Sequence, residues 1–423
     1  MIERAAILST GDELTTGRIV DSNASWIADK LFEMGVDVTC VITVGDYPDR
    51  LEWAWREAAA RADLVVSTGG IGPTADDLTS ETVARVAGVP LQEDAAAAAH
   101  VRGLFASLGR EMPANNLKQA LVPAGATIIS NRLGTAPGYR IACGGTQLVV
   151  LPGVPREMKA MVEETVLPWL RGQRGGAVHL ARVFQTFGIT ESGLDELVAG
   201  LVAPDEGRVS FRASFPEVSM RIVVHGDPDE SRERLERVSA RVRERLGPSC
   251  YGEGAVTMEE VAGRALHERG LRVAVAESCT GGLVGHRLTN VPGSSAWVRG
   301  GVMAYANEAK EAVLGVRART LAEHGAVSTE TATEMAAGVR RVLGAEVGLA
   351  VTGIAGPEGG SAEKPVGTVC FGLASDSGPA AARYQLWGTR DWVKLLASQV
   401  ALDWLRRHAL GLDMTESAVL RRR

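Results

Sequence analysis

Short apolar runs alternate with amphipathic stretches along most of the chain. Near the start, the strand-like runs 5–8, 38–44 and 64–66 are separated by helical patterns at 22–34 and 49–61. Wholly apolar strands that alternate with helices indicate a parallel sheet with helices on both faces. We therefore predict a doubly wound α/β domain, with ligands at the carboxyl ends of its strands.

The pattern changes after residue 170, where the glycine-rich, charged run 171–176 lacks an apolar face and is typical of a linker. A strand, a helix over 191–201, two alternating strands and a charged helix over 228–246 follow. This βαββα order predicts a small α+β module. We expect the Arg/Glu run 232–245 to be a solvated helix face with i,i+4 ion pairs.

From residue 255 onward, strands and helices alternate again. The predicted elements are a helix at 257–268, a strand at 271–276, a helix from about Cys279, a helix at 329–343, a strand at 346–351 and a helix at 390–408. We therefore predict a third, α/β domain. The three predicted domains are 1–171, 177–250 and 255–410.

Composition narrows the class of protein. The chain has 423 residues, 45% of them hydrophobic and 23% charged, which is the balance of a globular protein with large cores. The net charge of −6 argues against broad nucleic-acid binding. The five cysteines are scattered, which argues against a disulfide framework or a zinc site. No signal peptide or membrane-spanning run is recognisable, so we expect a cytoplasmic protein.

Two polar clusters follow predicted strands of the first domain, 10–13 (TGDE) and 69–77 (GGIGPTADD). Glycines let backbone N–H groups approach a phosphate, and neighbouring carboxylates can hold a divalent cation. The alternative is that Asp76 and Asp77 only cap a helix and that the glycines only turn the chain. The second cluster is not a Walker loop, because no GK[ST] follows.

Three stretches, GDELTTGRIVDSNASWIADKL, GGIGPTADDLTSETVA and LPGVPREMK, resemble the N-terminal domain of the CinA family, a relative of the molybdopterin-binding MoaB/MogA fold. The resemblance implies a metal-dependent pyrophosphatase that cleaves ADP-ribose to AMP and ribose 5-phosphate. A molybdopterin-type ligand remains an alternative, because both would use the same glycine loops. The implied ligands of the divalent metal are Asp12, Glu13, Asp76 and Asp77. The implied nucleotide contacts are Thr10, Gly11, Asn23, Gly69, Gly70, Gly72, Pro73, Thr74, Lys118, Asn131, Gly134 and Thr135.

In the CinA family a KH-like module occupies the middle position, in agreement with the βαββα order. A KH module that clamps nucleic acid needs a GxxG loop, and none occurs in residues 177–250. We therefore expect a scaffold or dimerisation role for this module rather than RNA binding.

In the third domain, Ser278 lies between a predicted strand and a helix, where a sharp turn exposes a nucleophile to helix N–H groups. His286 and His324 are poorly placed as its base. Lys310 could serve if burial lowers its pKa, although it could equally be a surface residue paired with an acid. Cys279 is an alternative nucleophile, because its thiol would lie at a helix start. Chemistry alone does not decide whether Ser278 or Cys279 is the nucleophile.

The stretches AESCTGGLVGHRLTNVPGSSAWVRGGVMAYANEAK, GAVSTETATEMA and VTGIAGPEGGSAEKPVGTV resemble the CinA C-terminal domain. Stand-alone relatives of that domain deamidate nicotinamide mononucleotide (NMN) to nicotinate mononucleotide and ammonia, without a cofactor. The resemblance implies a Ser278–Lys310 pair, assisted by Tyr305 and Thr352, and an arginine, Arg390, for the substrate phosphate. Further implied substrate contacts are Glu277, Cys279, Thr280, Gly281, Gly282, Gly353 and Gly356, with oxyanion donors near Cys279 and Thr280.

The two resemblances together predict a bifunctional enzyme of pyridine-nucleotide salvage, acting on NMN and ADP-ribose. They also imply a homodimer, and we expect neither a membrane nor a nucleic-acid partner. An accessory protein of competence or DNA damage, acting through protein contacts, is the alternative.

Overall fold

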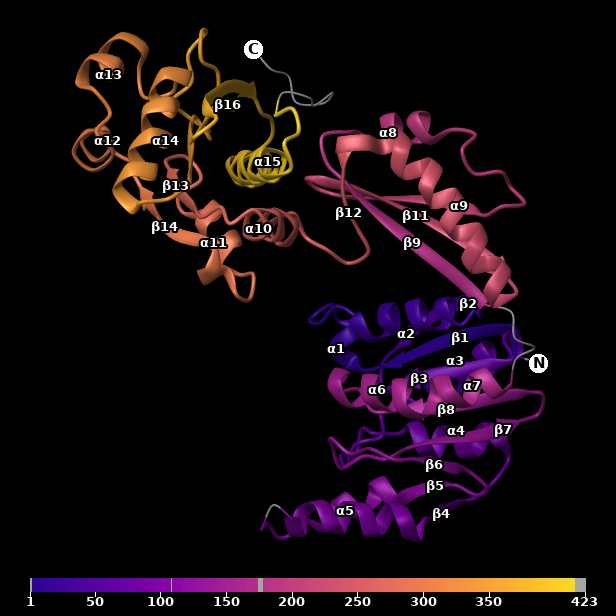
Figure 1. Cartoon of the computed structure of the whole chain (residues 1–423). Coiled ribbons are helices and arrows are strands. Elements are labelled where there is room, and N and C mark those ends of the chain that lie inside the picture. The colour runs from indigo at the N-terminus through magenta and orange to yellow at the C-terminus, as the bar shows by residue number, and fades with distance from the viewer. Residues whose placement is uncertain (1, 108, 174–177, 415–423) are drawn as a thin grey trace. The chain divides into compact units, whose positions relative to one another are not determined.

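The computed structural model describes residues 2–107, 109–173 and 178–414, so residues 174–176 of the predicted linker lie outside the described residues. The chain forms two compact units (Figure 1). One comprises Met1–Leu180 and Val224–Arg234, and the other comprises Ala181–Val223 and Leu235–Arg423. Most of the predicted middle module thus groups with the C-terminal part of the chain.

The first unit is built on a six-stranded sheet of order β2-β1-β3-β8-β7-β6. Its strands are β1 (Arg4–Thr10), β2 (Asp37–Val44), β3 (Leu64–Thr68), β6 (Thr127–Ile129), β7 (Gly138–Cys143) and β8 (Thr146–Leu151); β4 (Leu91–Glu93) and β5 (Leu121–Pro123) form a separate ribbon. Its helices are α1 (Asp12–Thr15), α2 (Ser22–Glu33), α3 (Pro48–Arg61), α4 (Thr79–Ala87), α5 (Ala95–Ser107), α6 (Pro155–Met161) and α7 (Leu167–Gly172), with a 3-10 turn at Ala114–Ala120 and a π turn at Val162–Val166.

Alternate residues of the central strands bury opposite faces of this sheet. Ala5 and Ile7 of β1 join the core under α2, α6 and α7, whereas Ala6 and Leu8 join the core under α3 and α4. The doubly wound arrangement is confirmed. The sheet is mixed rather than wholly parallel, because only Gly144 and Gly145 separate β7 from β8, and a two-residue connection makes antiparallel neighbours.

The middle module has a four-stranded sheet of order β10-β11-β9-β12. Its elements are β9 (Val178–Thr186), α8 (Glu191–Val198), β10 (Arg208–Ser214), β11 (Glu217–Gly226), α9 (Pro228–Leu246) and β12 (Cys250–Glu253), with a 3-10 turn at Gly247–Ser249. The predicted βαββα order is confirmed. β10 and β11 form an antiparallel hairpin whose two tip residues are Phe215 and Pro216.

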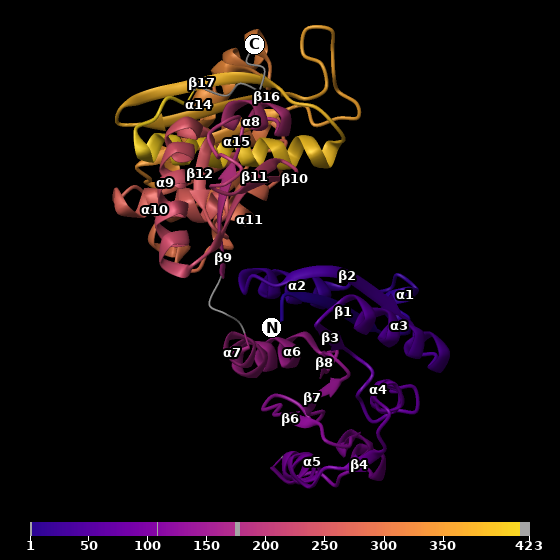
Figure 2. The same ribbon diagram turned by 90° about the vertical axis from the view of Figure 1, so that its right-hand side faces the viewer.

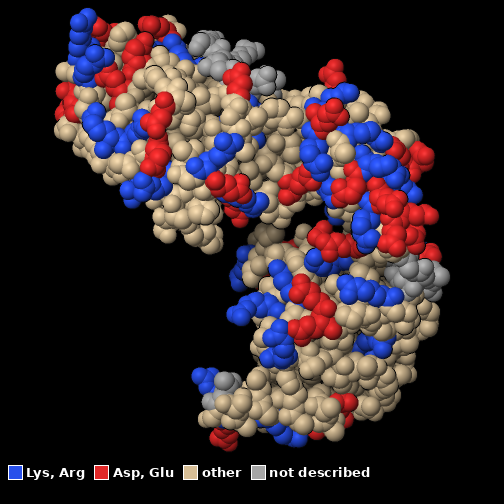
Figure 3. All heavy atoms as spheres, in the orientation of Figure 1, with Lys and Arg blue, Asp and Glu red and all other residues tan. Residues whose placement is uncertain are grey.

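Two arginines of α9 pair with acids outside the helix, whereas Arg232 pairs with Asp229 of the same helix at i,i+3 spacing. Arg241 contacts Glu206, and Arg243 contacts Glu253 at 2.6 Å, so these pairs are not the predicted i,i+4 pairs. Figure 3 likewise shows Lys/Arg and Asp/Glu side chains intermixed on the face in view. Positive side chains therefore do not form a single-sign stripe on that face.

The C-terminal domain has a five-stranded sheet of order β14-β13-β15-β16-β17. Its strands are β13 (Val273–Glu277), β14 (Val298–Met303), β15 (Val347–Gly353), β16 (Thr368–Ser375) and β17 (Gly378–Gln385). Its helices are α10 (Met258–Glu268), α11 (Leu283–Thr289), α12 (Asn307–Leu314), α13 (Ala318–His324), α14 (Thr329–Leu343) and α15 (Arg390–Leu410), with a 3-10 turn at Ser294–Ala296. The predicted helix from Cys279 begins only at Leu283, because residues 278–282 form a turn.

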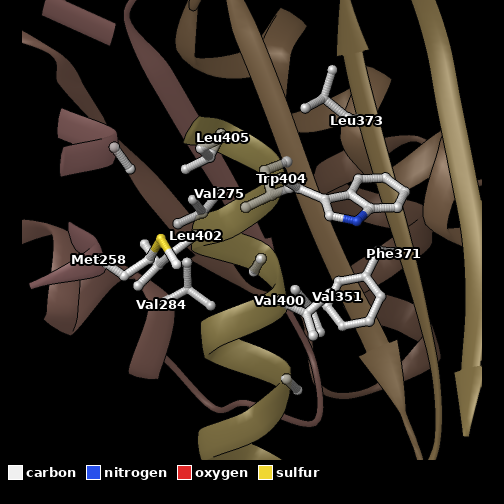
Figure 4. Packing of buried hydrophobic residues seen from close by; sticks show 14 of the residues in the cluster. Met258, Val275, Val284, Val351, Phe371, Leu373, Val400, Leu402, Trp404 and Leu405 are labelled. Atoms are coloured by element: carbon white, nitrogen blue, oxygen red, sulfur yellow. The ribbon is translucent and has the colours of Figure 1, made fainter. Parts of the chain in front are cut away.

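Helices cover both faces of this sheet (Figure 2). Ala274 and Ala276 of β13 pack toward α12 and α14, whereas Val273 and Val275 pack toward α10, α11 and α15. Figure 4 shows the second of these cores, where Val275 and Val351 lie among side chains of α15 such as Trp404. The carboxyl ends of β13 and β15 are thereby held rigidly side by side. Among the described helices, none combines the length and the apolar character needed to cross a membrane.

Candidate functional site

A cavity of about 230 Å³ lies at the carboxyl ends of β13 and β15. Its walls come from the turn after β13, the start of α12, the segment before α14, the end of β15 and the start of α15. The lining residues are Ser278, Cys279, Tyr305, Asn307, Lys310, Ala326, Val327, Thr352, Gly353, Ala355 and Arg390. Seven of the residues predicted for the C-terminal site therefore line one cavity.

The turn that carries Ser278 is fixed by backbone hydrogen bonds. The N–H of Ser278 donates to the carbonyl of Val351 at 2.9 Å, and the N–H of Gly281 donates to the carbonyl of Ser278 at 3.1 Å. Gly281 and Gly282 have φ values of 63° and 93°, which residues with a Cβ rarely adopt. The predicted glycines thus shape the turn that presents the serine.

The carboxylate of Glu277 stabilises the start of α11. It is buried and accepts hydrogen bonds from the N–H groups of Gly282, Val284 and Gly285, at 3.0, 3.1 and 2.7 Å. Three donors at a helix N-terminus suit a negative charge. Glu277 was predicted to bind substrate, but it does not line the cavity, and its carboxylate is directed to the protein backbone.

Lys310 is buried beside Ser278. Its side chain is 1% exposed, and its Nζ lies 3.4 Å from Ser278 Oγ and 3.0 Å from each of the carbonyl oxygens of Ala304 and Tyr305. Burial lowers the pKa of the Lys310 amine, because the charged form loses its water. A neutral amine has two hydrogens and one lone pair. With the hydrogens donated to the two carbonyls, the lone pair is left for the hydroxyl of Ser278.

Cys279 is buried next to Ser278 and also lines the cavity. Burial raises the pKa of its thiol to about 12. A thiol is a poor nucleophile, since the thiolate is the reactive form. The sulfur also packs against Gly353, where an added Cβ would lie 3.0 Å from Sγ. Between the two nucleophiles that the sequence left open, the structure therefore favours Ser278.

Tyr305 and Arg390 form one edge of the cavity. Arg390 donates from Nη1 to the carbonyl of Gly356 at 2.7 Å and from Nη2 to the hydroxyl of Tyr305 at 3.3 Å. The Tyr305 side chain is 60% exposed, and only its backbone carbonyl contacts Lys310. Tyr305 is thus placed to orient Arg390, and the guanidinium stands at the entrance, where an anionic group of a ligand could bind.

Two predicted threonines are buried at the site. Thr352 donates its hydroxyl to the carbonyl of Ala326 at 2.8 Å and so holds the segment 326–327 against the cavity. Thr280 Oγ1 is buried and has no hydrogen-bond partner among the described residues. With the N–H groups of Ser278, Gly281 and Gly282 bound to protein acceptors, those of Cys279 and Thr280 are the remaining candidates for an oxyanion hole.

Part of the cavity wall was not predicted from the sequence. Asn307, at the start of α12, and the segment 326–327 line the cavity but were not predicted. Asn307 follows a strand end and could have been found from that position, whereas Ala326 and Val327 have no chemical signature. Neither His286 nor His324 belongs to the lining residues of the described chain, which agrees with their exclusion as the base.

In the first unit, the ends of β1 and β3 are in contact. A Cβ added to Gly69 would lie 2.4 Å from the carbonyl oxygen of Thr10 and 2.7 Å from its Oγ1, and one added to Gly70 would lie 2.1 Å from Thr79 Oγ1. Only glycines let these loops approach so closely. Thr10 Oγ1 is buried without a partner among the described residues. Gly11 binds the carbonyl of Val44 at 3.1 Å, so the predicted loops share one sheet edge.

Carboxylates gather at this edge. The N–H of Asp12 donates to Asp46 Oδ2 at 3.2 Å, and the N–H of Asp46 donates to Asp12 Oδ1 at 3.3 Å. Burial raises the pKa of Asp46 to about 6, and repulsion from Asp12, Glu13 and Asp76 adds to the rise. Asp46 was missed, although its position just after β2 is the same signal that identified the other acids.

Asp77 is engaged within its own loop. Its Oδ2 accepts from the N–H of Thr74 at 2.8 Å and from the Thr74 hydroxyl, and it lies against Gly72. Lys118 donates to the carbonyl of Thr74 at 2.9 Å and lies 3.4 Å from Glu81. Asn115 donates to the carbonyl of Pro73 at 3.4 Å. These contacts fold residues 72–77 into a closed loop before α4.

The remaining acids, Asp12, Glu13, Asp46 and Asp76, are hard oxygen donors of the kind that Mg²⁺ or Mn²⁺ accepts. Within the described residues, however, no three His, Cys, Asp or Glu side chains converge on a common point. The donor chemistry therefore fits a divalent cation, while a preassembled cage is absent from the described part of the chain.

Asn23 and Asn131 hold backbone together. Asn23 Nδ2 donates to Thr68 Oγ1 at 3.1 Å and to the carbonyl of Gly153 at 2.8 Å, while its Oδ1 is buried without a described partner. Asn131 uses both ends of its amide, accepting from Gly134 N at 3.0 Å and donating to Glu157 Oε2 at 2.7 Å. Asn131 thus shapes the loop that contains Gly134 and Thr135, and only Asn23 keeps an acceptor unused.

Three known family models match successive parts of the chain. Residues 255–409 match the model described as the CinA C-terminal domain, residues 6–172 a probable molybdopterin binding domain, and residues 181–252 the damage-inducible protein CinA KH domain. The predicted fold class is confirmed, with a MoaB/MogA-like first domain.

Relatives match nearly the full chain. A CinA-like protein of Geotalea uraniireducens (strain Rf4) is 41% identical over 416 residues, 98% of this chain and 99% of its own length. A CinA-like protein of Anaeromyxobacter sp. (strain K) is 45% identical over 407 residues, 95% of this chain and 98% of its own. A crystal structure of CinA from Thermoplasma acidophilum, of unknown function, is 37% identical and covers 39% of this chain and 96% of its own, with a TM-score of 0.37. The near-complete matches to the two curated relatives show that the chain belongs to the CinA family.

Proposed function

We propose that the C-terminal domain hydrolyses the carboxamide of NMN to nicotinate mononucleotide and ammonia. One observation carries this proposal: a fully buried lysine amine lies 3.4 Å from a serine hydroxyl, with two carbonyls to accept its hydrogens. A lysine in such a position is a general base for a serine nucleophile. The arginine at the entrance, Arg390, suits the phosphate of a mononucleotide.

The reaction would proceed by two acyl transfers. Lys310, neutral, takes the proton of Ser278, and Ser278 Oγ attacks the carboxamide carbon while the N–H groups of Cys279 and Thr280 bind the oxyanion. The carbon–nitrogen bond breaks, and the proton held by Lys310 goes to the departing nitrogen, so that ammonia leaves. Water then gives a proton to Lys310 and attacks the ester carbon. Release of the carboxylate returns that proton to Ser278.

For the first unit we propose hydrolysis of ADP-ribose to AMP and ribose 5-phosphate. The support is the contact between the two glycine loops and the acids at the same sheet edge. A divalent cation, when bound there, would polarise the pyrophosphate; Asp12, Glu13, Asp46 and Asp76 are the residues that would hold it. A molybdopterin-type ligand is the second candidate, because residues 6–172 match a probable molybdopterin binding domain.

Assays on the purified full chain test both proposals. Ammonia release from NMN, with nicotinate mononucleotide as the second product, is expected from the C-terminal site. A protein that acts in competence or DNA damage only through protein contacts would release none. AMP release from ADP-ribose is expected from the first unit, and tight binding of a pterin without hydrolysis would instead favour the second candidate. We further propose that the enzyme acts as a homodimer, which sedimentation of the same sample would test.

A further inference from the structure

The hairpin of the middle module contacts the helix that carries Arg390. Phe215, at the hairpin tip, stacks on Trp392 of α15, with ring centroids 4.3 Å apart and ring planes inclined by 23°. Both rings remain partly exposed, Phe215 at 36% and Trp392 at 47%. Two exposed aromatic side chains, one from each module, thus bury each other at the start of α15.

Trp392 belongs to the first turn of α15, two residues after Arg390. Its N–H donates to Thr389 Oγ1 at 3.4 Å, a long bond, so the capping contact alone holds this turn weakly. The Trp392 side chain also packs closely on Gly388, where an added Cβ would lie 2.9 Å from the ring. The packing of Trp392 therefore adds to the other contacts of this turn, in which the N–H of Val393 donates to the carbonyl of Thr389 at 2.9 Å and the Val393 side chain is buried in the core.

A second contact ties the same hairpin to α15. Gln399 Nε2 donates to Glu217 Oε1 at 2.6 Å, and Gln399 Oε1 accepts from Arg287 at 2.7 Å. Residues 392 and 399 are two helical turns apart and lie on one face of α15. The hairpin therefore runs along the helix and contacts it at two points, one of them beside the entrance of the cavity.

We propose that Phe215 is a positioning residue of the amidohydrolase site, which by stacking on Trp392 holds Arg390 where the substrate phosphate binds. The proposal rests on the proposed NMN hydrolysis. Among the described residues, the hydrogen-bond partners of the Arg390 guanidinium are otherwise the carbonyl of Gly356 and the exposed hydroxyl of Tyr305. Movement of the first helical turn would shift Arg390 while leaving Ser278 and Lys310, which lie on other elements, in place.

Steady-state kinetics of NMN deamidation by full-length Phe215→Ala test this role. Because Phe215 lies at an exposed hairpin tip, the variant should fold. We expect KM for NMN to rise roughly two- to tenfold, the size of the contribution of an aromatic pair, with kcat changed less than about twofold. Phe215→Tyr keeps a ring and should restore the KM of the wild type.

Two further variants separate positioning from general weakening of the module. Phe211→Ala removes a half-buried ring from β10 of the same hairpin, where it lines a different cavity with Thr190 and Asp195, and should leave KM unchanged. In an Arg390→Gln background, Phe215→Ala should raise KM no further, because its effect acts through Arg390.

The outcomes separate the inference from the function on which it depends. If the wild type releases no ammonia from NMN, the proposed function fails and the role of Phe215 with it. If the wild type is active, the inference alone is overturned by an unchanged KM in Phe215→Ala, by an equal shift in Phe211→Ala, or by a further rise in the Arg390→Gln background.

Discussion

Replacing Lys310 by methionine should separate catalysis from stability. Methionine has a similar length and fills the buried site, but it offers no lone pair to Ser278. Loss of a general base lowers the catalytic rate roughly 10²- to 10⁴-fold, and more where the base and the nucleophile act as one unit. We therefore expect kcat/KM for NMN to fall by at least about 10³-fold, while the protein stays folded.

The pH dependence of wild-type activity follows from the same lysine. Burial lowers the pKa of Lys310 from the ordinary value of 10.5, and only the neutral amine can accept the serine proton. As pH rises through the lowered pKa, kcat/KM should rise about tenfold per pH unit and then level off below pH 10.5. The residual activity of Lys310→Met should lack this limb.

The lowered pKa of Lys310 should also affect the stability of the protein, independently of catalysis. Between the lowered pKa and 10.5, the unfolded chain binds a proton at Lys310 that the folded chain does not, so the free energy of unfolding rises with pH. In that window the wild type should gain about 1.4 kcal/mol per pH unit relative to Lys310→Met. The carbonyls of Ala304 and Tyr305 lose their donor in the variant, but this cost does not depend on pH.

Differential scanning calorimetry of both proteins across this pH range is the assay. The difference between their unfolding midpoints should change steadily in favour of the wild type as pH rises. Midpoints that run parallel, together with a pH–rate profile that has no rising limb, would refute the argument that Lys310 is neutral when the enzyme works.

Three other perturbations address other parts of the chain. Arg390→Gln should raise KM for NMN by roughly 10- to 100-fold in initial-rate assays, because a charge-assisted contact to phosphate is lost, and an unchanged KM would contradict the placement of the phosphate. Excess chelator should abolish ADP-ribose hydrolysis but not NMN deamidation, and loss of both activities, or of neither, would contradict the metal assignment. Asp46→Asn should weaken the activation of ADP-ribose hydrolysis by the metal about 10- to 100-fold. Asp403→Ala should destabilise the protein by about 3–5 kcal/mol, because Arg406 and Arg407, both buried and bound to Asp403 at 2.6–2.8 Å, lose their counter-charge; denaturant unfolding measures this.

The fold was largely predictable because its helices bury one face and its central strands bury both. The helical patterns at 22–34 and 49–61 correspond to α2 and α3 within a residue at each end. The direction of the edge strands was not predictable from apolar runs alone. It depends on connection length, as the two glycines between β7 and β8 illustrate.

The kind of chemistry at the candidate site was predictable from the sequence. Which of the candidate residues carry it was not. Ser278 and Lys310 are 32 residues apart, and they meet because β13 and β14 are parallel neighbours, a pairing that no local pattern specifies. Burial, which distinguishes Ser278 from Cys279 through the raised thiol pKa, is a tertiary property. The contact of Phe215 with Trp392 joins two modules, so neither segment alone could indicate it.

The identity of the nucleophile is the most direct test of the account. Ammonia release from NMN should be measured for the wild type, Ser278→Ala and Cys279→Ala under identical conditions. Ser278→Ala should lose about 10⁴- to 10⁶-fold in kcat, because the covalent step disappears. Cys279→Ala should keep most of the activity, because only its backbone N–H takes part. An inactive Cys279→Ala beside an active Ser278→Ala would contradict the serine–lysine mechanism and replace it with a thioester one.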